Sequence, residues 1–138
     1  MSITNLQVIE DALREINVIS EVDNASPEQG KYALRKLNQL MEVWKENDID
    51  IGYYAQKTTT GTCPIPDWAE LGVTLALGIM CASKYGATVS RETAAVADTA
   101  MGMIARKSIS EKLNNADMSH MPVGSGWIGD GYNIETDA

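Results

Sequence analysis

The sequence contains no phenylalanine, one histidine and only two cysteines among its 138 residues. Without Phe, the large core side chains must come from Leu, Ile, Met, Tyr and the three Trp. The lone histidine, His120, excludes a His-rich metal site. Cys63 and Cys81 lie 18 positions apart, which fits neither a zinc motif nor a disulfide framework. We therefore expect two inert thiols, no metal ligands and no cofactor.

Long hydrophobic runs are also missing. The longest one, residues 71–82, is interrupted by Thr74 and Gly78 and is shorter than a membrane span. The first residues, MSITNLQVIEDALRE, have neither the basic start nor the apolar stretch of a secretory signal. We expect a protein that is made in a cytoplasm and does not enter a membrane.

Basic residues are scarce, and the formal net charge is −8. No Lys or Arg follows Lys112, whereas four acidic residues do. Binding to a phosphate backbone requires Lys and Arg to displace counterions, so this composition argues against affinity for nucleic acid.

Helical patterns, in contrast, are abundant. Capping boxes at Thr4 and Ser26 predict the starts of two helices, and Trp44 closes the apolar stripe of the second, which should end near residue 47. A third box, Asp67 with Glu70, predicts a buried central helix that stops near Gly86. A fourth helix, rich in small residues, should run over about 90–114. Its core face is predicted to be Ala94, Ala97, Met101 and Ile104.

Between the second and third helices the periodicity changes. Ile49, Ile51 and Tyr53 alternate with polar residues or Gly, which predicts a short strand or an extended arm. The Thr-rich stretch that follows, up to Pro66, is typical of a hairpin or an exposed loop. The predicted fold is thus mainly α: a compact bundle of about four helices over residues 1–117, with a short hairpin or extended loop at about 48–66.

The last residues, 118–138, have no helical period and are rich in glycine, which predicts an extended C-terminal docking tail. Within it, GSGWIG (124–129) has the G-x-G-x-x-G spacing of a dinucleotide-binding turn. Such a turn needs a strand before it and a helix after it, and only nine residues follow Gly129. The glycines instead suit a segment that lies flat on another protein. The residues expected at this interface are Met121, Pro122, Gly124, Ser125, Gly126, Trp127, Ile128 and Tyr132.

Carboxylates supply the only plausible catalytic groups. Asp48 and Asp50 flank the alternating segment, and Glu10, Asp11 and Glu15 share the first helix. Glycoside hydrolysis needs two carboxyls set across a sugar cleft, and a sequence does not show such a cleft. Carboxylates on solvated faces are far commoner, so we expect no catalytic residue.

Three stretches carry a resemblance to a known family. They are DALREINVI (11–19), ALRKLNQLMEVWKENDIDIGY (33–53) and MPVGSG (121–126). Together with the order of the elements, they resemble the tail accessory factor, or head-completion adaptor, of short-tailed bacteriophages, over about residues 5–126.

The resemblance implies a structural virion protein at the head-to-tail junction, assembled in the cytoplasm of the host bacterium. It would form a ring, expected to hold twelve copies, beneath the portal protein, closing the DNA-filled head. The tail nozzle and the tailspikes would attach on the other side. Packaged DNA would pass through the ring without specific binding, which an acidic surface favours. Two alternatives stay open: a peptidoglycan-degrading virion enzyme that uses carboxylates such as Asp48 or Glu70, and a small helical regulator.

Overall fold

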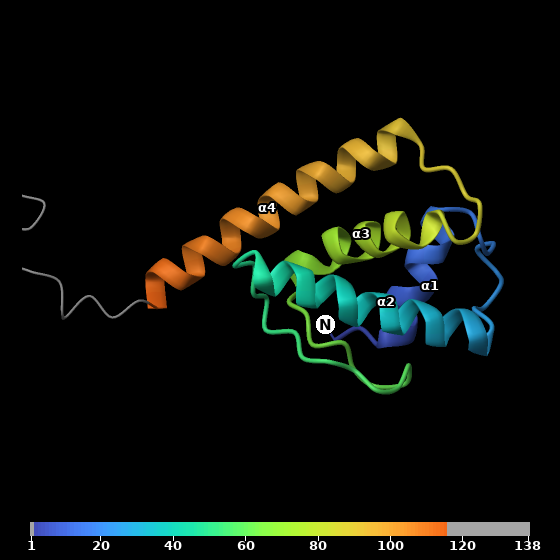
Figure 1. The fold of residues 1–138 in the computed structure, drawn as a ribbon, viewed down its shortest axis with the longest axis horizontal. Helices are drawn as coiled ribbons and strands as arrows, with labels where there is room; N and C mark the ends of the chain where they lie inside the picture. The colour runs from blue at the N-terminus through green and yellow to red at the C-terminus, as the bar shows by residue number, and fades with distance from the viewer. Residues whose placement is uncertain (1, 116–138) are drawn as a thin grey trace, which may run out of the picture.

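The computed structural model describes residues 2–115, and this part of the chain contains four α-helices (Figure 1). In chain order the elements are α1 (Asn5–Glu15), α2 (Pro27–Glu46), the 3-10 turn η1 (Asp67–Ala69), α3 (Glu70–Ala82) and α4 (Arg91–Asn115). The prediction of a mainly α fold is confirmed. The predicted docking tail, 118–138, lies outside the described residues.

The first two helices begin where their capping boxes predict. The Thr4 hydroxyl accepts a hydrogen bond from the Gln7 backbone N–H, and the Gln7 side chain accepts one from the Thr4 N–H. Ser26 and Gln29 make the same reciprocal pair, with Pro27 at the first helical position. Both boxes satisfy backbone donors that a helix start leaves unpaired.

The third helix begins differently from the prediction. A 3-10 turn precedes it, and Pro66, not Asp67, occupies the N-cap position of that turn. The backbone of Pro66 is extended, so Asp67 already lies inside the first turn. The helix ends at Ala82, and the chain then turns at Gly86, which has the predicted left-handed conformation with a φ of 63°.

Helix α3 is the centre of the fold, because it packs against α1, α2 and α4 (Figure 1). Two of its glycines allow unusually close contacts. A Cβ atom at Gly78 would lie 2.9 Å from the backbone oxygen of Ala12 in α1, and one at Gly72 would lie 2.3 Å from Cδ1 of Ile104 in α4. Without side chains at these positions, α1 and α4 approach opposite sides of the same helix.

The core that results is made mostly of aliphatic side chains. The predicted stripe of α2, from Leu34 to Trp44, is buried, and so are Ile9 and Leu13 of α1. Trp68 is only half-buried but packs against this core. In α4 the buried positions are Ala97, Ala100, Ile104 and Ser108, whereas the predicted Ala94 and Met101 are partly exposed.

The connection between α2 and η1 is an extended loop, and neither the strand nor the hairpin alternative forms. Ile49, Ile51 and Tyr53 do turn toward the core as their alternation predicts, but no second strand lies beside them. The backbone N–H and carbonyl of Asp50 instead bond to the buried Ser108 hydroxyl of α4, both at 3.2 Å.

The Thr-rich end of this loop pairs with the start of α1. The carbonyls of Gly61 and Thr59 accept hydrogen bonds from the Asn5 and Leu6 N–H groups, each at 2.9 Å. The buried Asn5 side chain donates to the Thr58 carbonyl at 2.8 Å. These loop carbonyls are occupied by the helix start, so they are not available for a hairpin ladder.

The contact between α1 and α3 predicts that Gly78→Ala is destabilising. A methyl group would press on the Ala12 backbone, which cannot move as a side-chain end can, so the free energy of unfolding should fall by about 1–3 kcal/mol. Urea denaturation followed by circular dichroism measures this.

Gly102→Ala in α4 is the matched control. Its nearest neighbour, the Arg106 guanidinium, is at an ordinary 3.5 Å, so alanine should be neutral or stabilise the helix by up to about 1 kcal/mol. Equal stability of the two variants would contradict the role given to Gly78.

Candidate interaction surfaces

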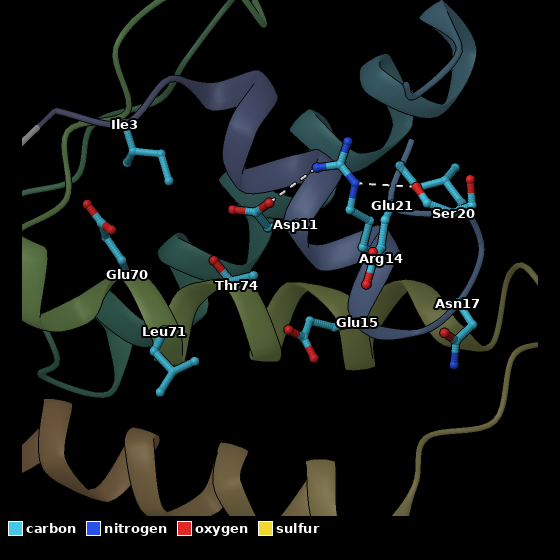
Figure 2. Close-up of a pocket in the computed structure, with 11 residues that line it drawn as sticks. Ile3, Asp11, Arg14, Glu15, Asn17, Ser20, Glu21, Glu70, Leu71 and Thr74 are labelled. Carbon is cyan, nitrogen blue, oxygen red and sulfur yellow. Dashed lines mark hydrogen bonds and ion pairs between the residues drawn. The ribbon is translucent and has the colours of Figure 1, made fainter. Parts of the chain in front are cut away.

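An open groove of about 860 Å³ lies between α1 and α3 (Figure 2). Four carboxylates line it, and Arg14 is the only cation on its walls. We call this surface the acidic groove. Its carboxylates are Asp11 and Glu15 on the exposed side of α1, Glu21 on the following loop and Glu70 at the start of α3.

Arg14 organises one wall of the groove. Its guanidinium lies 3.4 Å from the Asp11 carboxylate and donates to the backbone carbonyl of Ser20 (Figure 2). It also donates to the backbone carbonyl of Asp23 at 3.0 Å. The neighbouring Glu10 is buried, and its carboxylate accepts a hydrogen bond from the Ala25 N–H at 3.0 Å. These contacts hold the loop between α1 and α2 against α1. Glu10 therefore has a structural task, and Asp11 and Glu15 remain at the surface.

The other carboxylates proposed from the sequence do not join this groove. Asp48 and Asp50 lie on the α2–η1 connection, outside the groove lining. The Asp48 carbonyl accepts a hydrogen bond from Lys112, and the Asp50 carboxylate accepts one from the Gly52 N–H. Of Asp48 and Glu70, the two residues named for the peptidoglycan-degrading alternative, only Glu70 lines the groove.

An apolar surface adjoins the acidic groove. It is a second hollow, of about 430 Å³, between Leu71 of α3 and the outer side of α4. Leu71 lines both hollows and is 54% exposed, so the two surfaces are continuous. We call this surface the apolar strip. Its apolar members are Leu71, Ala95, Val96, Ala100 and Met103.

Helix α4 is thus apolar on two sides. One side packs on α3, an adjoining side exposes Val96 and Met103, and Ile109 and Leu113 are exposed on a further side toward the end of the helix. The prediction from the sequence missed this outer side, because it sought a single core stripe. The signal was present: these four large side chains do not fall on the face that holds Ile104.

A third surface is basic. Around Tyr32 of α2, the Lys84 ammonium lies 3.8 Å from the ring centroid, and Lys36 and Arg35 lie 5.5 and 5.8 Å from it. The Tyr85 ring meets Tyr32 edge-on, with centroids 6.1 Å apart. The exposed Lys31 lines the same cleft, together with Glu28. We call this surface the Tyr32 cluster: Lys31, Tyr32, Arg35, Lys36 and Lys84.

The two thiols are buried and not suited to nucleophilic attack. Burial raises the pKa of Cys63 to about 11 and also raises the pKa of Cys81. The thiolate is the reactive form, so both groups stay protonated at neutral pH. This agrees with the prediction of inert thiols.

The interface residues predicted from the sequence cannot be placed. All eight, from Met121 to Tyr132, lie outside residues 2–115, as does His120. Within residues 2–115, no group of three or more His, Cys, Asp or Glu side chains is arranged to hold a metal ion. No helix in the same range is long and apolar enough to cross a membrane.

The raised thiol pKa predicts a loss of stability at alkaline pH. The unfolded chain releases the Cys63 proton near pH 9, while the folded chain holds it until about pH 11. The free energy of unfolding should therefore be unaffected below pH 9 and fall by about 1–2 kcal/mol between pH 9 and 10.5. Urea denaturation at pH 8 and pH 10.5 measures the difference. The variant Cys63→Ala should show a shallower decline, and an identical decline would assign the effect to other groups.

Comparison with known proteins agrees with the resemblance seen in the sequence. A family model described as the P22 tail accessory factor matches residues 1–136. No curated protein is significantly similar to the chain. The match covers nearly the whole sequence, including the segment beyond the described helices. A family match of this length, on a chain with a helical fold, leads to one conclusion: the chain belongs to the P22 tail accessory factor family and is a structural component of a bacteriophage virion.

Proposed function

We propose that the protein is the head-to-tail adaptor of its phage, assembling as a ring under the portal protein at the head–tail junction. In this role it closes the DNA-filled head and provides the attachment site for the tail nozzle and tailspikes. The observation that carries the proposal is the apolar strip. An exposed apolar surface beside a packed helix contact is expected in a subunit whose neighbour completes its packing.

The occupant proposed for the apolar strip is a second copy of the chain. The strip continues at Leu71 into the acidic groove, so one neighbouring subunit would cover both. The net charge of −8 suits a ring whose channel passes DNA without holding it. The C-terminal residues 121–132 are proposed to dock on the portal or on a neighbouring copy, and ring assembly would multiply these weak contacts through avidity.

The ring proposal predicts a change of mass on mixing. Light scattering should show a mass that shifts from the 15.0 kDa chain to a defined multi-copy complex when the portal ring of the same phage is added. Met103→Glu should prevent this shift because it places a charge in the apolar strip.

Val43→Glu is the control, since Val43 is an exposed apolar residue of α2 outside the strip. It should assemble like the unmodified chain. A small stable oligomer that ignores the portal would contradict the adaptor function.

The docking role of the C-terminal residues predicts the effect of Trp127→Ala. Loss of an aromatic anchor should weaken binding to the portal ring by about 2 kcal/mol, roughly 30-fold, and leave the melting temperature nearly unchanged. Calorimetric titration and thermal denaturation measure the two effects.

Trp68→Ala provides the contrast. This side chain packs against the core, so its loss should lower the melting temperature. A similar drop for Trp127→Ala would place Trp127 in the folded core instead.

A further inference from the structure

We propose that the Tyr32 cluster of one copy binds the acidic groove of the next copy, so that charge complementarity joins the subunits head to tail. This inference deepens the proposed function and rests on it, because it specifies the contact between copies in the ring. The cluster and the groove are both built from described residues, and within residues 2–115 the two surfaces share no lining residue.

The charge of the Tyr32 cluster is uncompensated. Three cations lie within 6 Å of the Tyr32 ring centroid, and Lys31 lines the adjoining cleft, in which Glu28 is the only carboxylate. Within residues 2–115, no carboxylate lies within ion-pair distance of Lys31, Arg35, Lys36 or Lys84, since the ion pairs found there belong to Arg14. The ring face attracts these cations but does not neutralise them. Gathering like charges in this way is costly unless an anionic partner covers them.

The acidic groove has the opposite balance, four carboxylates against one guanidinium. The groove has four carboxylates and Arg14, and the Tyr32 cluster has four cations beside Glu28, so the two surfaces are complementary in sign and in number of charges. The chain as a whole has a net charge of −8. An acidic protein would repel its own copies if its charges were spread evenly. Segregated charges allow two copies to attract each other in one orientation only.

Among residues 2–115, the two surfaces of one molecule do not meet. The groove lies between α1 and α3, and no residue of α2 lines it (Figure 2). Lys31 and Arg35 are exposed on α2, whose inner side packs on α1 and α3. In the proposed contact, a second copy brings its cluster to the groove. Because the two surfaces differ, the contact is heterologous, and repeated contacts of this type close into a ring when the rotation allows it.

Charge-swapped variants test the pairing. One variant carries Arg35→Glu and Lys84→Glu in the cluster, and the other carries Glu15→Lys and Glu21→Lys in the groove. Each alone sets like charges against each other at every contact, so its assembly on the portal ring should weaken at least about tenfold. Mixed in equal amounts, the two variants can alternate around the ring, and every contact then pairs opposite charges. The mixture should recover assembly to within about threefold of the unmodified chain.

The control variants are Lys45→Glu and Glu42→Lys, which reverse exposed charges of α2 outside both surfaces. Light scattering and native mass spectrometry at low and high salt give the mass, and circular dichroism confirms that each variant is folded. Assembly of the swapped variants as readily as the controls, or failure of the folded mixture to recover, would overturn the pairing. In either case, assembly of the unmodified chain on the portal would leave the adaptor function intact. Failure of the unmodified chain to assemble would instead overturn the adaptor function.

Discussion

The fold depends on the close packing of α3 against its neighbours. At Gly78 the helix lies so near α1 that the backbone of Ala12 takes the place a side chain would need, and at Gly72 it receives the end of Ile104 from α4. A chain without phenylalanine builds its core from short aliphatic side chains, so the helices must approach closely to exclude water. The small residues of α3 and the inner side of α4 make that approach possible.

This packing leaves the long connection between α2 and η1 to be held by polar contacts. Asn38 of α2 accepts hydrogen bonds from the Tyr53 hydroxyl and the Gln56 N–H. The Ser108 hydroxyl bonds the Asp50 backbone earlier in the connection, and the Asn5 side chain donates to the Thr58 carbonyl later in it. Each of these side chains forms a hydrogen bond with a backbone group of the loop that would otherwise lack a partner beside the core. The loop is thus part of the folded body, although it contains no regular secondary structure.

The same arrangement leaves apolar and charged surfaces exposed. Helix α4 packs mainly on α3 and η1, and the α2–η1 connection bonds it at Ser108 and Lys112. Large apolar side chains of this 25-residue helix, such as Val96 and Met103, remain exposed. Two of these surfaces also differ in charge, with four carboxylates along the α1–α3 groove and four cations in the Tyr32 cluster. For a family of structural virion proteins, surfaces of this kind are consistent with contacts between subunits, in which apolar area contributes affinity and charge selects the orientation.

The sequence by itself determined the helices and the family. Capping boxes at Thr4 and Ser26, and the period of the apolar residues in α2, are local features that follow from backbone hydrogen bonding and helical geometry. Only the tertiary structure decided the roles of polar and charged residues. Glu10, Asp11 and Glu15 look alike along the chain, yet one is buried beneath a loop and the others line an open groove. Likewise, Lys84 joins Arg35 around one ring only because α2 and the end of α3 are neighbours in space. Local patterns depend on residues a few positions apart, whereas surfaces depend on contacts between distant segments.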